Sequence, residues 1–356
     1  MNPALTNTGA RGLQPRLPRG VALAVFFAVL ASASLTAQSG NAASASPPVD
    51  GDTMSAAELA ALGRSLDGEG SWILLERGRI ALEEGEPGTA LAAFLEAREV
   101  AAREVYPEAD LALGDFWRTE GDLAQAERAF GRALDDLRIA ENLTGYREYD
   151  YGMLRFVLLE RLAELFRLRE NYGGMEEQYR AIVQADRDFS SGTMADRIVA
   201  NYLESGLNKV LTLYRLSAGF AVRAYAELGW LYYRNGNHEK AIRHSVFAVT
   251  NILSTVIREL RRSDPQYAFV SMETTLRDGL RRTGTRAYLQ ETDVWKALYY
   301  LAAESHAANR QTRAREIWGI LQRLREAGRY QDLATRQLAR PWVEPPLKEP
   351  FRSQSR

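Results

Sequence analysis

The feature that most constrains the fold is a spacing of small and aromatic residues that occurs twice in the chain. The stretch Leu75–Ala97 reads LERGRIALEEGEPGTALAAFLEA, and Ala112–Leu134 reads ALGDFWRTEGDLAQAERAFGRAL. The same residue types recur 36 positions apart at five places: Gly78 and Gly114, Gly85 and Gly121, Ala90 and Ala126, Phe94 and Phe130, Ala97 and Ala133. Recurrence at one fixed separation indicates a structural unit that is repeated along the chain.

The spacing within each copy predicts a helical hairpin. A helix over 72–84 would end at Gly85, because glycine is the usual residue after the last helical turn. Pro87 suits the first turn of the following helix, where its missing N–H leaves no hydrogen bond unmade. In the second copy Gly121 ends the first helix, and Asp122 can cap the next one.

The small residues predict where the two helices of a hairpin touch. Gly78 and Ala90 fall at the expected crossing point, where a side chain larger than a methyl group would push the helices apart. Phe94 and Ala97 lie further along the same face of the second helix. We expect them to fill the groove against the first helix of the next unit.

A similar order of small and large residues returns further along the chain. The stretch ELGWLYYRNGNHEKAIRHSVFA carries it at Gly229, Tyr232, Gly236, Ala241, Ser245 and Ala248. The pattern resembles the tetratricopeptide repeat (TPR) family, whose units are helix–turn–helix pairs of about 34 residues. The resemblance implies an all-α, right-handed TPR-like helical-hairpin solenoid over residues 71–338. Its units would span residues 71–103, 107–140, 156–189, 222–253 and 295–327.

Two stretches between these units are too long to be simple turns. They are residues 190–221 and 254–294, which we expect to be atypical helical insertions. Residues 195–217 would form two helices around Gly206. Residues 251–284 would form two more, separated at the sequence Ser-Asp-Pro of 263–265.

The N-terminal segment is typical of a targeting sequence. Basic residues precede the short apolar run Val21–Ala33, and a cleavage site after Ala37 would make residues 1–37 a signal peptide. The alternative is an uncleaved membrane anchor formed by Val21–Ala37. Either interpretation predicts an exported bacterial protein, periplasmic or otherwise associated with the cell envelope, with residues 38–66 as a flexible linker.

The C-terminal segment 339–356 contains four prolines and is predicted to be an extended tail. An unstructured end is the simpler expectation for such a segment. The alternative is that Trp342 and Phe351 dock on the solenoid or on a partner.

Composition excludes several classes of function. The chain has no cysteine, which excludes disulfides, thiol nucleophiles, cysteine-ligated metals and a lipoprotein anchor. A net charge of −1 gives no electrostatic reason to expect nucleic-acid binding. The histidines, His238, His244 and His306, lack a metal-ligand spacing and are expected to be solvated. No cofactor, metal site or catalytic set is predicted, and the protein is not expected to be an enzyme.

The resemblance also implies where a partner would bind. In TPR proteins the first helix of each hairpin lines a concave groove. The groove positions here give the candidate partner-binding residues Arg79, Asp115, Arg118, Glu164, Arg167, Arg223, Trp230, Tyr233, Arg234 and Tyr299. Arginine and aromatic side chains are common anchors at protein interfaces.

We therefore expect a non-catalytic protein–protein interaction scaffold or adaptor that holds a partner or an extended peptide in this groove. The alternative is a solute-binding or transport accessory protein that holds a small anionic ligand there. Arginines converging on one pocket would favour this alternative, whereas arginines spread along the groove would favour the scaffold.

Overall fold

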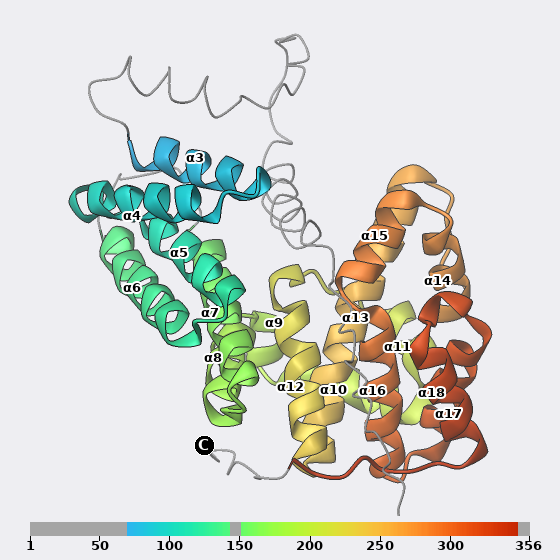
Figure 1. Ribbon diagram of the computed structural model, residues 1–356. Coiled ribbons are helices and arrows are strands. Elements are labelled where there is room, and N and C mark those ends of the chain that lie inside the picture. The colour runs from blue at the N-terminus through green and yellow to red at the C-terminus, as the bar shows by residue number, and fades with distance from the viewer. Residues whose placement is uncertain (1–69, 143–150, 348–356) are drawn as a thin grey trace, which may run out of the picture.

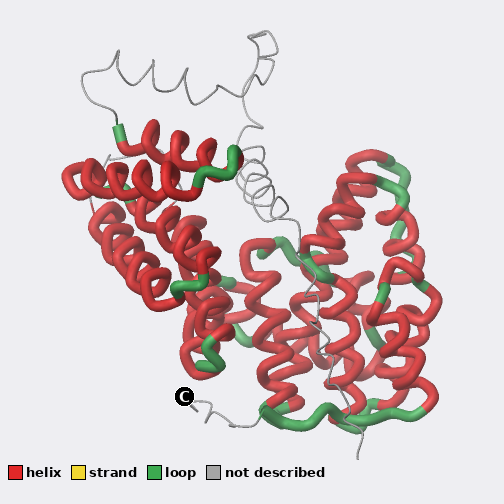
Figure 2. The backbone as a smooth tube through the Cα atoms, viewed as in Figure 1, coloured by secondary structure: helices red, strands yellow, loops and turns green. Residues whose placement is uncertain are grey.

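The computed structural model describes residues 70–142 and 151–347, and every regular element within these two ranges is a helix (Figures 1 and 2). The all-α prediction is therefore confirmed for the described residues. The predicted signal segment 1–37, the linker 38–66 and residues 348–356 lie outside them. The helices are α3 (Ser71–Glu83), α4 (Pro87–Glu104), α5 (Pro107–Glu120), α6 (Leu123–Asn142), α7 (Tyr151–Leu168), α8 (Tyr172–Gln184), α9 (Arg187–Ser190), α10 (Thr193–Ser205), α11 (Leu207–Leu213), α12 (Val222–Arg234), α13 (His238–Ser263), α14 (Met272–Leu280), α15 (Thr283–Glu291), α16 (Val294–Ala307), α17 (Gln311–Arg323) and α18 (Arg329–Ala339), with short 3₁₀ turns at Gly219–Ala221 and Arg325–Ala327.

Helices that follow one another in sequence pack as hairpins. The pairs are α3 with α4, α5 with α6, α7 with α8, α12 with α13 and α16 with α17. Each pair also touches its neighbours, for example α4 with α5 and α6 with α7. Figure 1 shows the resulting succession, with α3 and α4 at one end of the array and α17 and α18 at the other.

A glycine and a phenylalanine hold each N-terminal hairpin together. A Cβ atom built on Gly78 would lie 2.2 Å from the ring of Phe94, and one on Gly114 would lie 2.3 Å from Phe130. Even a methyl group is excluded at these distances, so the crossing is tighter than the sequence predicted. Phe94 also meets Phe116 of the next hairpin edge-on, with ring centroids 6.4 Å apart.

The helix ends predicted at glycines, and the predicted side-chain cap, are present in the structure. Gly85 and Gly121 adopt positive φ angles of 81° and 88°, which glycine reaches without strain. Asp122 caps α6, since its side chain accepts a hydrogen bond of 2.9 Å from the backbone N–H of Gln125.

The two insertions differ in how well they were predicted. Gly206, with φ of 82°, separates α10 from α11 as expected. Residues 251–263 do not form a separate helix, because α13 runs without a break for 26 residues to Ser263. Its partner α12 has only 13 residues. The apolar side chains in the overhanging half of α13 stay buried. Helices α11, α14 and α15 pack against α13, with Gly279 of α14 beside Val256 and Tyr288 of α15 hydrogen-bonded to Thr255.

The buried apolar residues fall into three clusters. One small cluster joins α3, α4 and α5, and a second joins α6 to α7. A single much larger cluster extends from α7 and α8 to the C-terminal segment. Helix α7 thus lies at the boundary between a segmented core and a continuous one.

The described part of the C-terminal segment is not an unstructured end, so the simpler expectation was wrong. Residues 340–347 leave α18 and lie against the other helices, with Leu347 only 9% exposed. The backbone N–H of Leu347 donates to the carbonyl oxygen of Arg234 at 3.0 Å. Hydrogen bonds and one buried leucine compensate for the ordering of this segment.

Candidate partner-binding surface

Four of the predicted groove residues meet in one ion-pair network on α5, α7 and α12. Asp115 contacts Arg118 at 3.3 Å and Arg161 at 2.9 Å. Glu164 contacts the same two arginines at 4.0 and 3.6 Å, and it also pairs with Arg223. The network therefore joins the first helices of three successive hairpins.

A second group continues the charged surface towards α16. Glu227 pairs with Arg167 at 3.3 Å and with Lys296. Burial alone would raise the pKa of Glu227, but Lys296 and the nearby arginines hold it below its ordinary value. Trp230 lies beside this group, with the Lys296 ammonium 6.0 Å and the Arg234 guanidinium 5.8 Å from its ring centroid.

Glu160 is the carboxylate in this surface whose charge is least favoured. Burial raises its pKa to about 7, an effect that Glu164 and Glu227 reinforce and Arg223 opposes. The network is thus poised to change its charge close to neutral pH. We refer to Asp115, Arg118, Glu160, Arg161, Glu164, Arg167, Arg223, Glu227 and Lys296 as the charged face.

Four members of the charged face, Glu160, Arg161, Glu227 and Lys296, were not among the predicted site residues. Two of them, Arg161 and Glu227, had no support from the resemblance at all. They fall between the family's groove positions, so the resemblance passed over them. Their spacing was a usable signal, since Arg161 stands three residues before Glu164 and Glu227 four residues after Arg223. Opposite charges at these offsets share one face of a helix.

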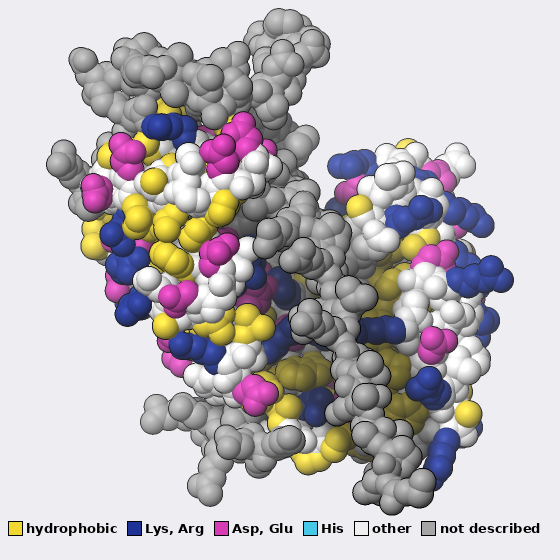
Figure 3. Space-filling view, in the orientation of Figure 1, with side chains coloured by type: hydrophobic (Ala, Val, Ile, Leu, Met, Phe, Trp, Pro, Cys, Tyr) yellow, Lys and Arg dark blue, Asp and Glu magenta, His cyan; other side chains and the backbone are white. Residues whose placement is uncertain are grey.

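Three of the arginines, Arg118, Arg161 and Arg223, converge on Glu164, whose carboxylate already pairs with them. Arg118, Arg161, Arg167 and Arg223 are spread over three helices, and each faces a carboxylate. Figure 3 likewise shows basic and acidic side chains interspersed over the N-terminal helices. Arg79 lies apart on α3, paired with Glu76 at 3.1 Å.

The remaining predicted residues, Tyr233, Arg234 and Tyr299, face the C-terminal segment. Arg234 Nε donates to the carbonyl oxygen of Pro345 at 3.0 Å, and the hydroxyl of Tyr233 accepts from the backbone N–H of Glu344 at 2.9 Å. These positions are therefore occupied by the chain itself.

The histidines are not all solvated, and the prediction for His244 was wrong. His244 is 7% exposed, and its ring lies among Phe189, Tyr225 and Tyr232 of the C-terminal core. Its Nδ1–H donates to the carbonyl oxygen of Lys240 at 2.7 Å, and burial lowers its pKa to about 4. Sequence could not show this, because the surrounding rings come from other helices.

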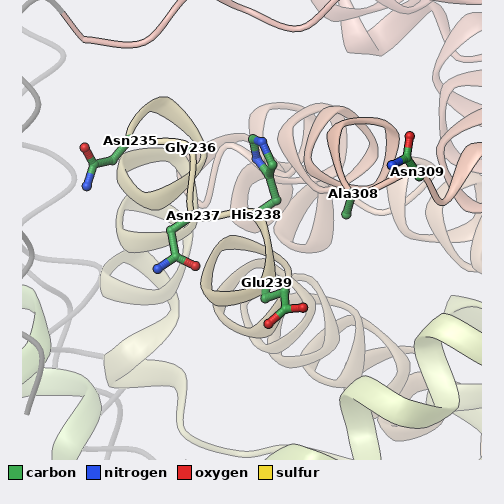
Figure 4. Close-up of a pocket in the computed structure, with 7 residues that line it drawn as sticks. All are labelled: Asn235, Gly236, Asn237, His238, Glu239, Ala308 and Asn309. Atoms are coloured by element: carbon green, nitrogen blue, oxygen red, sulfur yellow. The ribbon is translucent and has the colours of Figure 1, made fainter.

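A depression of about 550 Å³ lies away from the charged face (Figure 4). It separates two hairpin turns and is lined by Asn235, Gly236, Asn237, His238, Glu239, Ala308 and Asn309. Small-molecule sites are mostly apolar and concave, and this polar wall does not match them. Within residues 70–142 and 151–347, no three histidine, aspartate or glutamate side chains are grouped to hold a metal ion.

Comparison with known proteins gives distant bacterial relatives. No protein-family model matches the chain. A protein of Treponema pallidum is 25% identical over 219 residues, which cover 60% of this chain and 56% of that protein. One of Borreliella burgdorferi is 20% identical over 274 residues, covering 70% and 83% of the two chains. Both are described as uncharacterized proteins.

Within the part of the chain that the structure describes, no helix is both long enough and apolar enough to cross a membrane.

Proposed function

We propose that this chain is a right-handed TPR-like solenoid that acts as a non-catalytic scaffold or adaptor. The tight glycine–phenylalanine crossings 36 residues apart support the repeat architecture, because the same contact closes the first two hairpins. The N-terminal sequence supports export to the bacterial cell envelope.

The observation that carries the proposal is the charged face. It runs across α5, α7, α12 and α16, and some of its side chains are half-exposed, such as Arg167 at 45% and Arg223 at 48%. Both signs of charge lie within a few ångströms of each other. A protein segment that carries both charges can exchange these internal pairs for equivalent pairs of its own.

A small anionic ligand suits this surface less well. Such a ligand would need several arginines aimed at one point, with their charges available. Here Arg118, Arg161 and Arg223 do meet at one point, but the Glu164 carboxylate already occupies it. Arg167 is directed at Glu227 instead. An extended partner segment lying across successive hairpins fits that distribution better.

The test is capture of partners from an envelope extract by the full chain. In one variant Arg118, Arg167 and Arg223 are each replaced by glutamate. In the matched control the three reversed arginines are Arg138, Arg262 and Arg281, which are 71%, 79% and 79% exposed and lie away from the charged face.

We expect the control to recover the same proteins as the unaltered chain and the charged-face variant to lose them. Circular dichroism of both variants establishes that each is folded. Equal recovery by all three proteins would contradict the assignment of partner binding to the charged face.

A further inference from the structure

The C-terminal segment of the chain docks as an extended peptide on one edge of the solenoid. After α18 it runs past the ends of α16 and α12 (Figure 1). Gln337 holds its start in both directions, donating to the carbonyl oxygen of Trp342 at 3.1 Å and accepting from its N–H at 2.9 Å. We call the receiving surface, formed by Tyr233, Arg234, Tyr299, Tyr300 and Gln337, the tail site.

Most contacts of the tail site recognise main chain. Tyr233 accepts from the N–H of Glu344, Arg234 donates to the carbonyl oxygen of Pro345, and the Arg234 carbonyl accepts from the N–H of Leu347. Any extended peptide offers such groups. Pro345 and Pro346 favour an extended conformation in advance, which lowers the entropy lost on docking.

Two side chains of the segment give the site its selectivity. Glu344 lies 3.6 Å from the Arg234 guanidinium and also accepts a hydrogen bond from Tyr300. Leu347, three residues later, is buried in the core. The site therefore recognises an acidic residue followed, after two prolines, by an apolar residue.

The segment is held at a few points rather than along its whole length. The large apolar side chains Trp342 and Val343 remain 37% and 47% exposed. One buried leucine and a few hydrogen bonds must offset the ordering of eight residues, from 340 to 347. Such an occupant can be exchanged for another peptide of the same pattern.

The tail site is continuous with the charged face. The Arg234 guanidinium that holds the segment also lies over the ring of Trp230, and the Lys296 ammonium of the charged face lies near the same ring. A peptide bound in the tail site can therefore continue onto the charged face.

We propose that the tail site is a docking site for an extended acidic and proline-containing segment of a partner protein, and that residues 341–347 are its resting occupant. A partner segment with the pattern Glu-Pro-Pro-Leu displaces them. This inference rests on the proposed scaffold function and specifies one class of peptide that the scaffold accepts.

The test uses a fluorescent peptide with the sequence of residues 340–347, Arg-Pro-Trp-Val-Glu-Pro-Pro-Leu, and measures its binding by anisotropy. The proteins are the full chain, the full chain with Leu347→Asp, and the full chain with Glu344→Arg. The two substitutions release the chain's own segment in different ways, by removing the apolar anchor or the acidic one.

We expect both released chains to bind the peptide at least about tenfold more tightly than the unaltered chain, because a tethered occupant competes at high effective concentration. Adding Arg234→Glu to the Leu347→Asp chain should abolish binding, whereas Arg336→Glu, on exposed α18 surface, should not. A peptide with arginine in place of its glutamate should regain binding to the Arg234→Glu chain.

Equal binding by the released and unaltered chains, or binding insensitive to Arg234→Glu, would overturn the tail site. The two proposals fail separately. If the peptide does not bind but partner capture still depends on Arg118, Arg167 and Arg223, the scaffold stands without a tail site. If the peptide binds but partner capture is insensitive to those arginines, the tail site stands and the assignment of partner binding to the charged face fails.

Discussion

The hairpins before α7 and the helices after it bury apolar surface in different ways. Before α7, the cores are small, and each is confined to one or two hairpins. After α7, a single core includes residues from α8 to the docked segment. The same structural unit, a helical hairpin, thus produces a segmented region at one end and a continuous one at the other.

The residues at the helix crossings explain the difference. In the N-terminal hairpins glycine meets phenylalanine of the same hairpin, as at Gly114 and Phe130. In the C-terminal region Gly229 of α12 meets Ser245 of α13, whose hydroxyl donates to Glu304 of α16 at 2.8 Å. Burial raises the pKa of Glu304 well above its ordinary value, which favours the neutral carboxyl. The Gly114–Phe130 contact joins the two helices of one hairpin. The contacts from Gly229 through Ser245 to Glu304 join three helices.

Stability should follow this division. Contacts confined to neighbours make the stability of a repeat array a sum of local terms, whereas a shared core makes it cooperative. We expect α3–α6 to unfold before the C-terminal region and to exchange amide hydrogens sooner.

The largest expected effect comes from Gly114→Ala. The added methyl would lie 2.3 Å from the Phe130 ring, so α5 and α6 must separate, at a cost of about 3 kcal/mol. Thermal unfolding should show an early transition in α3–α6 with the later transition unchanged.

The matched control for that substitution lies in the same hairpin. Gly131→Ala has nothing within 4 Å of its new Cβ atom and should stabilise α6 by about 0.5–1 kcal/mol, since alanine is the better helix former. Gly229→Ala should instead lower the later transition. A single transition that shifts as a whole in all variants would refute the division into two regions.

An acid effect of nearly the same size should be confined to the C-terminal region. The pKa of His244 is about 4 in the folded chain and about 6.5 when unfolded, so the unfolded state takes up its proton first. Above pH 6.5 the titration of His244 should leave the free energy of unfolding unchanged. It should fall by about 3 kcal/mol as the pH drops from 7 to 4.

His244→Phe removes this titration while keeping an aromatic ring in the pocket. Chemical denaturation at several pH values should show that the difference between the unaltered chain and the variant changes only below pH 6.5. A difference that is independent of pH would mean that folding leaves the pKa of His244 unchanged.

A smaller pH dependence of stability, opposite in sign to that of His244, should appear at the junction of the two regions. The pKa of Glu160 is raised to about 7, so stability is fully present below pH 4.5 and decreases as the pH rises through 7. Glu160→Gln should recover on the order of 1–2 kcal/mol at pH 8, because partial exposure reduces the full effect.

The same variant should show little change at pH 4.5, and comparing denaturation curves at the two values checks it. Stabilisation of equal size at both values would point to packing rather than charge. Loss of stability at pH 8 would show that the ionised carboxylate is needed by the arginines around it.

The smallest expected effect tests whether an ion pair within a single hairpin contributes to its stability. Arg132 of α6 contacts Asp110 of α5 at 2.6 Å, and the aspartate side chain is only 5% exposed. Arg132→Ala should cost about 1 kcal/mol in the early transition because a buried carboxylate loses its partner. Arg138→Ala, which breaks an exposed pair with Asp135, should cost less than about 0.5 kcal/mol.

Sequence was most informative where the determining contacts are close along the chain. The spacing predicted that Gly78 lies at a helix crossing, although it named Ala90 as its partner and assigned Phe94 to the groove against the next unit. In the structure the Phe94 ring is the side chain that packs on Gly78. Helix ends at Gly85 and Gly206 were equally visible, because the glycine itself supplies the required conformation.

Contacts between distant parts of the chain could not be predicted. The docking of residues 340–347 depends on Tyr233 and Arg234, about 111 positions earlier. Likewise, the unbroken course of α13 depends on α11, α14 and α15, which pack against apolar surface that would otherwise be exposed. The charged face was partly predicted, because a family position template finds Glu164 and Arg223 but passes over Arg161 and Glu227.

The length of α13 has an evolutionary consequence. A helix twice as long as its hairpin partner can persist only while two separate excursions of the chain shield its far end from water. Shortening that helix would remove part of the surface on which both excursions pack, so we expect the three to vary together. Homologous chains in which this helix is short should therefore lack both the stretch between α8 and α12 and the one between α13 and α16.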